Sequence, residues 1–458
     1  MKKLVLGAVA LVFTFQSALA DVPAPQAPVV LNPAKIRELV LNSNLSLVQA
    51  MNNVHDAKDR VNIARGNLLP SINLGGAIAM ASGATFVLAS ASFLLPFLMP
   101  SRWFDQAQSK DLFESEKLSF QLSELNTYSS TLSLYLTIQS DQEIRKVYED
   151  QARSLRQIAD ILEVDYHLGT ATKEAWQQAD AQALMAEANA SKLAELAAQE
   201  KAAMRMALGL PLDAQFEFGP AEIPFSEWES KPLSEAAEAA KNASLERRQV
   251  DYLVSAAKSA TWSKAFSFLN AFSLAGTAGA PGESVSFDKS SFTGSVNFGF
   301  AYFPTLSLSQ RSIEEMKLQG DIIEQQSRRL IEATTLSLVE AQRQYTVSQR
   351  AEDEMKSVYE ATVLKYQLGS ATLLDVLTAS SQLATSSVSR IKSRLDVDTL
   401  RVTLHRAYIS DQFAEIPACK LNEPVNDRGS GGFWGWFRGA TRGNGGAAMS
   451  PEKACRGT

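Results

Sequence analysis

The chain has 458 residues, enough for two or more ordinary domains or for one large repetitive body. Its formal charge of -6 argues against a nucleic-acid-binding surface, and its 45% hydrophobic and 21% charged residues are typical of a folded protein. No long segment rich in Leu, Ile and Val follows the first 20 residues, so any membrane-embedded part must consist of strands.

The N-terminal 20 residues have the three parts of a secretory signal peptide. Lys2 and Lys3 precede an uncharged run that ends with the small residues Ala18 and Ala20. The strongly apolar part of this run is too short to span a bilayer comfortably, which disfavours a membrane anchor. We therefore predict that residues 1–20 are cleaved and that the mature chain lies in an oxidising compartment beyond the inner membrane.

The sequence predicts two shorter helices, and each is followed by a segment rich in Gly, Ala, Ser and Phe. The first such segment has no charged residue or His from Gly66 to Ser101, but its glycines and polar residues favour strands over a membrane helix. In the second, large apolar residues alternate with small or polar ones from Val296 to Tyr302, which is the period of a strand. The predicted helices and strand pairs lie at residues 33–69, 71–100, 231–262 and 266–304.

Two long blocks of the chain are almost free of proline and glycine. No proline lies between Pro100 and Pro211, or between Pro304 and Pro417. Because proline breaks helices and glycine weakens them, each block is predicted to be helical. Each block is interrupted once in a matching place, by Gly169 in the first and by Gly369 in the second. The predicted elements are two helical hairpins, over residues 102–208 and 306–410.

The two hairpins are related by an internal repeat with an offset of 200 residues. The first turn reads Tyr-His-Leu-Gly-Thr-Ala-Thr at residues 166–172, and the second reads Tyr-Gln-Leu-Gly-Ser-Ala-Thr at residues 366–372. Most of these positions are identical, and a clustered match at a shared helix break indicates duplication. The predicted division is a first repeat at 21–230, a second at 231–414 and a C-terminal tail at 415–458.

Apolar residues in both hairpins recur every seven positions. A sevenfold apolar period makes helices supercoil against their neighbours. Ala, Ser, Thr and Gln fill much of the rest, which favours closely packed helices with one polar face, as in the wall of a wet tunnel. An ordinary solvated coiled coil is the alternative. The recurring residues are Leu118, Leu125 and Leu132 in the first block, and Met316, Ile323 and Leu330 in the second.

The order of helix, strand pair and helical hairpin, repeated once, resembles the TolC-like outer-membrane efflux protein family. The most specific stretches are Lys365 to Leu377 around the second turn and Ala64 to Ser71 where a helix gives way to a strand. The resemblance covers about Pro33 to Ala414. It implies an α+β fold class, with long α-helical coiled-coil hairpins forming a periplasmic tunnel. It also implies four β-strands per chain, contributed to a trimeric twelve-stranded outer-membrane β-barrel.

The resemblance implies an outer-membrane exit channel of a tripartite efflux or type I secretion system. Such a channel passively conducts substrates from an inner-membrane pump and a periplasmic adaptor across the periplasm and the outer membrane. The implied partners are two further copies of the chain in a homotrimer, the adaptor, the inner-membrane transporter and outer-membrane lipid. A soluble periplasmic coiled-coil adaptor or scaffold stays open as a different class, although it would not need the phenylalanine-containing strand pairs.

The hairpin tips are the candidate functional residues. In the family they face the adaptor and the pump, which implies that role for Leu168, Gly169, Thr170, Ala171, Thr172, Leu368, Gly369, Ser370, Ala371 and Thr372. Thr372 and Asp375 have the spacing of a helix capping box. The first repeat has Ala175 in place of the acidic residue, so we expect the two tips to differ.

The sequence shows no motif for catalysis or for a cofactor. Its histidines, His55, His167 and His405, are far apart in the sequence, and no Walker loop, nucleophile elbow, dinucleotide fingerprint or metal-type spacing is present. We therefore expect neither an enzyme nor a metal protein. The two cysteines, Cys419 and Cys455, both lie in the tail, and export favours a disulfide between them.

Overall fold

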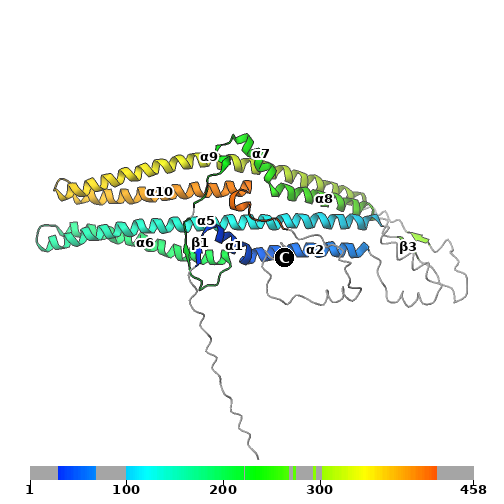
Figure 1. Ribbon diagram of the computed structural model, residues 1–458, viewed down its shortest axis with the longest axis horizontal. Helices are drawn as coiled ribbons and strands as arrows, with labels where there is room; N and C mark the ends of the chain where they lie inside the picture. The colour runs from blue at the N-terminus through cyan, green and yellow to red at the C-terminus, as the bar shows by residue number, and fades with distance from the viewer. Residues whose placement is uncertain are drawn as a thin grey trace, which may run out of the picture.

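The computed structural model describes residues 29–68, 99–220, 222–267, 272–274, 292–294 and 302–419. Figure 1 shows these residues folded mainly into long helices that lie side by side. The two longest are α5, Pro100–His167, with 68 residues, and α9, Tyr302–Gln367, with 66. At 1.5 Å per residue each is about 100 Å long. The described chain is therefore an elongated body rather than a compact globule.

Each long helix is followed by a shorter partner that returns along it. Helix α6, Lys173–Leu208, packs against α5, and α10, Leu373–Tyr408, packs against α9. Both returning helices have 36 residues, and their bounds differ by 200 positions. The duplication seen in the sequence is therefore also a duplication of backbone structure.

The helix that precedes each strand segment is broken once, where the sequence predicted a single helix. The first break is at Asn44, whose side-chain oxygen accepts hydrogen bonds from the backbone N–H groups of Ser46 and Leu47. The second is at Ser244, which caps the following helix by accepting from the N–H of Arg247. Asn and Ser compete with the helix for backbone hydrogen bonds and favour such caps. The four helices are α1, Pro33–Ser43, α2, Leu45–Leu68, α7, Leu233–Ala243, and α8, Leu245–Ala265.

A parallel pair of short strands, which the sequence did not predict, lies beside the middle of α5. Strand β1, Val29–Leu31, pairs with β2, Phe216–Phe218, so residues almost 190 positions apart meet. The Tyr135 hydroxyl group on α5 donates to the Gly219 carbonyl oxygen at 2.5 Å and lies 3.1 Å from the Leu31 carbonyl oxygen. This hydroxyl therefore fastens the sheet to the long helix.

The strand pairs are only partly within the described residues. Strands β3, Phe272–Leu274, and β4, Phe292–Gly294, form an antiparallel pair inside the predicted segment 266–304. The predicted pair at 71–100 lies outside the described residues, apart from its last two positions. Residues 302–304 were assigned to a strand but begin α9, and Pro100 begins α5. Proline is tolerated in a first helical turn because the N–H groups there have no intrahelical partner.

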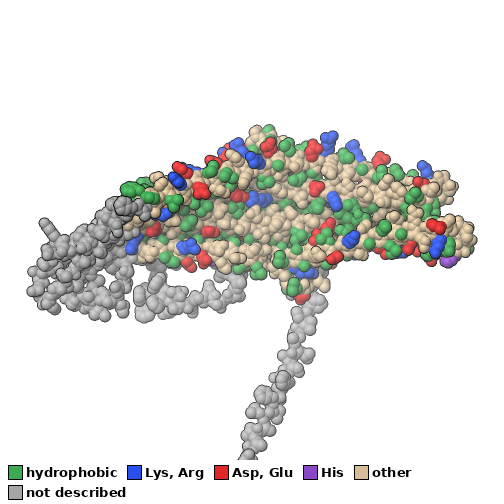
Figure 2. Space-filling view, turned by 180° about the vertical axis from the view of Figure 1, so that it is seen from behind, with side chains coloured by type: hydrophobic (Ala, Val, Ile, Leu, Met, Phe, Trp, Pro, Cys, Tyr) green, Lys and Arg blue, Asp and Glu red, His purple; other side chains and the backbone are tan. Residues whose placement is uncertain are grey.

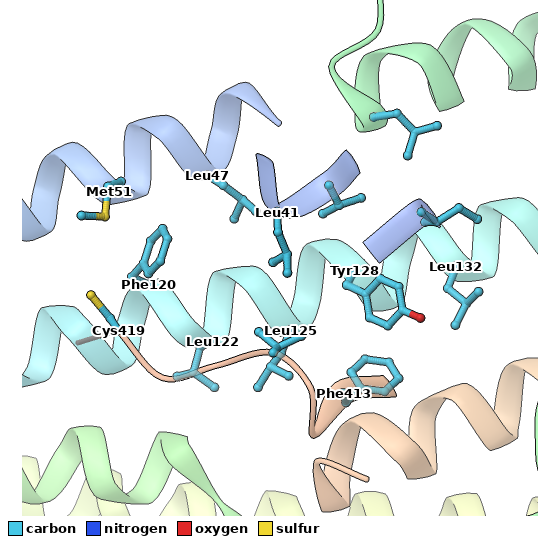
Figure 3. Close-up of a cluster of buried hydrophobic side chains, with 14 of the residues drawn as sticks. Leu41, Leu47, Met51, Phe120, Leu122, Leu125, Tyr128, Leu132, Phe413 and Cys419 are labelled. Atoms are coloured by element: carbon cyan, nitrogen blue, oxygen red, sulfur yellow. The ribbon is translucent and has the colours of Figure 1, made fainter. Parts of the chain in front are cut away.

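The main apolar core lies where α1 and α2 pack against the middle of α5, as Figure 3 shows. The end of the second repeat completes this core, since Phe413, Ile416 and Cys419 are all buried in it. Arg37 on α1 holds the same segment by donating to the Gln412 carbonyl and by an ion pair with Glu415. The segment 415–419, assigned from the sequence to the tail, is therefore part of the packed body.

The sevenfold pattern has different outcomes in the two hairpins. Leu118, Leu125 and Leu132 are all buried, as the spacing predicted. In the second hairpin, Leu330 is exposed. The physical reason is that α5 packs against α2, α6, α8 and α10, whereas α9 packs mainly against α7, α8 and α10. One face of α9 therefore has no partner within the described chain.

Candidate functional site

Both hairpins turn at a glycine in the left-handed conformation. The φ angles of Gly169 and Gly369 are 78° and 73°. In the first turn the N–H of Thr170 donates to the Asp165 carbonyl at 2.8 Å, and the N–H of Gly169 donates to the Tyr166 carbonyl at 3.0 Å. The second turn repeats both bonds 200 residues later, at 2.8 and 2.9 Å. This is the hydrogen-bond pattern of a Schellman motif, which satisfies carbonyls at the end of a helix.

The returning helices are capped differently. Thr172 accepts a hydrogen bond from the Ala175 N–H at 3.2 Å, and this is the only side-chain cap at the start of α6 that the structure shows among the described residues. Thr372 accepts from the Asp375 N–H, while the Asp375 carboxylate accepts from the Thr372 N–H at 2.8 Å. This reciprocal pair is a capping box. The hydrogen bonds from Thr372 hold the pKa of Asp375 below its usual range.

The two tips present a similar backbone but different side chains. Leu168 and Leu368 occupy equivalent positions and are 71% and 74% exposed. Beside the first tip the ring of Tyr166 stacks on Trp176, with centroids 6.1 Å apart. The position equivalent to Trp176 in the second hairpin is Val376, which is buried. Each tip therefore offers an exposed leucine, and the first also has an aromatic pair beside it.

The two tips are fastened to each other by apolar contacts. Leu373, the first residue of α10, packs against two small clusters in the first hairpin. One cluster contains Leu155 and Ala183, and the other contains Leu162 and Ala179. The equivalent residue of α6, Lys173, is exposed. The second tip therefore packs against the first, and the two form a single end surface.

Ion pairs join the outgoing helix of each hairpin to the returning one. Arg156 on α5 pairs with Asp180 and Glu187 of α6. Arg390 on α10 pairs with Glu352 of α9. Because each pair joins the outgoing helix to the returning one, it resists separation of the two helices.

A groove of about 470 Å³ lies between the two hairpins. It is lined by α5 on one side and by α9 and α10 on the other. The Tyr359 side chain hydrogen-bonds with Ser154 across it, and burial raises the pKa of the Tyr359 hydroxyl group. Two of the lining carboxylates are already paired, Glu352 with Arg390 and Asp150 with Arg153. The charged lining residues are Asp150, Glu352, Asp353, Lys356 and Glu360.

A pair of carboxyl groups lies between α5 and α6, and sequence reasoning did not single it out. Burial, the charge of Asp141 and a hydrogen bond with Asp141 together raise the pKa of Glu200 to about 7, and burial contributes most. Carboxylates are common on solvated helix faces, so the sequence does not distinguish Asp141 and Glu200 from the other acidic residues. Only the packing of α5 against α6 does so.

The remaining candidate residues do not gather at the tips. Cys419 is disulfide-bonded and buried in the core, whereas Cys455, its predicted partner, lies outside the described residues, so their pairing stays a prediction. His405 is buried far from His167, with its ring nitrogens 2.9 Å from Ser410 Oγ and 3.0 Å from the Pro224 carbonyl oxygen. Within the described ranges, no group of side chains has the arrangement of a metal site, and no helix has the length and apolarity to span a membrane.

Comparison with known proteins gives similarity at the level of structure. No protein-family model and no curated protein sequence matches the chain. A crystal structure of a membrane protein from Pseudomonas aeruginosa matches with a TM-score of 0.65 and 14% identity, over 83% of this chain and 91% of that one. The CmeC outer membrane channel of Campylobacter jejuni matches with a TM-score of 0.63 and 15% identity, over 84% and 88%. The open state of the MtrE outer membrane channel of Neisseria gonorrhoeae matches with a TM-score of 0.60 and 13% identity, over 82% and 88%.

These matches cover more than four fifths of both chains, so they extend over residues of both hairpins rather than over one coiled-coil segment. The matched proteins include channels from different bacteria, and at such low sequence identity what is shared is the fold. The chain therefore has the fold of the TolC-like outer-membrane channels.

Proposed function

We propose that the protein is an outer-membrane exit channel of a tripartite efflux or type I secretion system. The observation that carries the proposal is the similarity to outer membrane channels over more than four fifths of the chain. The predicted signal peptide supports it, because export is needed to reach that membrane. The segments at 71–100 and 266–304, predicted from the sequence to be strand pairs, would form the membrane-embedded part.

The unpartnered face of α9 supports assembly with further copies of the chain. Its exposed apolar residues Leu318, Ile322, Leu336, Val347 and Val358 fall within about 40° of one another on a helix with 100° per residue. The stripe therefore runs along one side of α9 for about 60 Å. Figure 2 likewise shows hydrophobic side chains exposed between charged ones on one face of the body. Heterologous contacts that close a ring would bury such a stripe in each copy.

The end surface formed by the two tips is the proposed docking site for the periplasmic adaptor and the inner-membrane pump. Its exposed Leu168 and Leu368 provide apolar contacts, and the pair of Tyr166 and Trp176 adds aromatic area of the kind enriched at protein interfaces. Energy for transport would come from the pump, because the chain has no nucleotide-binding motif.

Membrane fractionation tests the proposal against the alternative of a soluble periplasmic scaffold. We expect the protein in the outer-membrane fraction, extracted only by detergent, as a trimer by light scattering. The purified trimer should also conduct ions in a planar bilayer. Recovery in the soluble periplasm without detergent would refute the channel and favour the scaffold.

A second experiment tests the tips. A strain lacking the gene is complemented with the wild type or with the double variant Leu168→Glu/Leu368→Glu, and drug sensitivity and protein secretion are measured. We expect the double variant to form trimers but to lose transport. The matched control is Leu184→Glu, the same substitution at a half-exposed leucine of α6 away from the tips. Normal transport by the double variant would show that the two exposed leucines of the tips are not needed for docking.

A further inference from the structure

Four helix ends meet at the end of the body opposite the tips. Arg102 on α5 donates a hydrogen bond to the Asn67 carbonyl at the end of α2. The Ser263 hydroxyl group at the end of α8 donates to Asp105 of α5 at 2.5 Å. The Tyr302 hydroxyl group at the start of α9 donates to the Ala265 carbonyl at 2.7 Å. Figure 1 shows α2, α5 and α8 ending together, next to β3.

Aromatic side chains gather at these helix ends. Phe104 stacks on Trp262 with ring centroids 6.1 Å apart and on Phe266 with centroids 5.7 Å apart. Trp103, Trp262 and Phe303 are all exposed. Two of the four tryptophans among the described residues therefore lie within a few residues of a helix end on this side of the body. We call the residues Arg102, Trp103, Phe104, Trp262, Lys264, Phe266 and Phe303 the junction collar.

The charge at this end is opposite in sign to that of the whole chain. Within the seven terminal residues of α2, α5, α8 and α9 here, the cations are Arg65, Arg102 and Lys264, and the only carboxylate is Asp105, giving +2. The corresponding helix ends at the tips carry four carboxylates and two lysines, giving -2. Arg102 also lines a groove of about 530 Å³ between α2 and α5, together with exposed Ile63.

The segments of sequence that connect these helix ends are almost free of charge. No charged residue or histidine occurs from Gly66 to Ser101. In the second connection, residues 267–282 and 290–302 are uncharged as well. The collar thus lies at the boundary between a charged helical body and connections whose composition suits a hydrocarbon layer. Aromatic residues and Lys or Arg are concentrated at such boundaries, where headgroups accept both.

We propose that the junction collar lies at the headgroup level of the periplasmic leaflet and binds anionic phospholipid. Trp103, Trp262 and Phe303 insert their rings among the headgroups, and Arg102 and Lys264 pair with lipid phosphates. The collar thereby fixes the depth at which the helical body meets the membrane. This inference rests on the proposed outer-membrane location but adds a lipid-binding surface to it.

Fluorescence quenching by labelled lipids tests the depth of the collar. The full chain is prepared with Trp262 as its only tryptophan, the others being replaced by Phe, and is reconstituted into phosphatidylethanolamine–phosphatidylglycerol vesicles. The vesicles carry a nitroxide either on the headgroup or in the middle of the acyl chain. We expect loss of Trp262 fluorescence with the headgroup label and little loss with the mid-chain label. The matched control, a chain with Trp176 alone, should lose no fluorescence with either label.

The outcomes separate this inference from the proposed function. If the protein floats with the vesicles but keeps full Trp262 fluorescence with both labels, the junction collar does not lie at the headgroup level. Its rings would then lie between copies of the chain. Protein that does not float with vesicles would instead contradict the channel. Circular dichroism checks that the Trp→Phe variants keep the helical content of the wild type.

A second measurement tests the charges without removing any tryptophan. Phosphatidylglycerol that co-purifies with detergent-extracted protein is quantified by mass spectrometry. We expect Arg102→Gln/Lys264→Gln to lose bound phosphatidylglycerol, whereas the tip variant Lys173→Gln/Lys365→Gln keeps it. Equal retention in both variants would overturn the role of these two cations.

Discussion

Gly209 marks a close approach between two helices that no other residue type fits. It follows α6 with a φ of 64°, in the left-handed region. A Cβ placed on Gly209 would lie 2.0 Å from the Ser43 carbonyl oxygen and 2.6 Å from the Ser43 carbonyl carbon at the end of α1. Gly169 has a similar φ of 78°, but a Cβ there would meet no atom within 4 Å. An alanine at either position would therefore have an unfavourable φ angle, but only an alanine at Gly209 would also clash with a neighbouring helix.

Because of this clash, we expect Gly209→Ala to lower the free energy of unfolding more than Gly169→Ala does. Both substitutions place an alanine in the left-handed region, at about 1–2 kcal/mol. At Gly209 the backbone of α1 must also move, and forcing extra atoms into a packed site costs about 1–3 kcal/mol. That movement strains the hydrogen bond of 2.7 Å from the Asn44 side chain to the Ala207 carbonyl, which contributes about 1 kcal/mol. The totals are about 3–6 kcal/mol for Gly209→Ala and about 1–2 kcal/mol for Gly169→Ala.

Thermal unfolding of the two variants in the same detergent, followed by circular dichroism at one scan rate, measures this difference. At roughly 2 °C per kcal/mol for a large chain, the midpoint should fall by about 6–12 °C for Gly209→Ala and by about 2–4 °C for Gly169→Ala. Equal shifts would refute the reasoning, because they would mean that α1 accommodates the added methyl group without cost.

Two further perturbations act on other parts of the helical body. Because the pKa of Glu200 is about 7 in the folded chain against 4.5 for an ordinary glutamate, the folded state binds more protons in that window and stability falls as the pH rises through it. Glu200→Gln should abolish this fall, measured as unfolding midpoints between about pH 5 and pH 8, and a variant that keeps the wild-type profile would contradict the assignment. Thr372→Ala removes the hydroxyl group that accepts from the Asp375 N–H and donates to the Asp375 carboxylate, at about 1 kcal/mol, so hydrogen exchange in the first turn of α10 should rise. Thr172→Ala, which removes only the bond from the Ala175 N–H, should raise exchange less at the start of α6, and equal rises would show that the bond between the Thr372 hydroxyl group and the Asp375 carboxylate adds nothing.

The long helices and their turns were predictable because the determinants are local. The absence of proline over more than 100 residues permits a helix, and the glycine of a Schellman motif ends it within the sequence Tyr-x-Leu-Gly. The structure places the ends of α5 and α9 at His167 and Gln367, directly before that leucine and glycine. The capping box at Thr372 is local in the same sense, since its two residues are three positions apart.

The features that the sequence did not reveal depend on contacts between distant residues. Strands β1 and β2 have three residues each and carry no periodic signal, and they pair only because α5 brings them together. Leu330 fits the sevenfold pattern as well as Leu125 does, but α9 lacks the neighbouring helices that bury Leu125 on α5. The break at Asn44 rests on local bonds from the Ser46 and Leu47 N–H groups, but its amide group also donates to the Ala207 carbonyl of α6, a contact that the sequence does not reveal.

Duplication fixed the backbone of the two tips but left their surroundings free to diverge. The left-handed glycine and the two Schellman hydrogen bonds recur in both, and this geometry satisfies carbonyls at the end of each helix. The residue that follows the cap is under no such constraint, and it is exposed Lys173 in one hairpin and packed Leu373 in the other. The apolar contacts of Leu373 bind the second tip to the first, so a partner at this end meets one joined surface with two unlike halves. In a ring of three copies the halves alternate, and a partner that recognises Trp176 would find three binding positions rather than six.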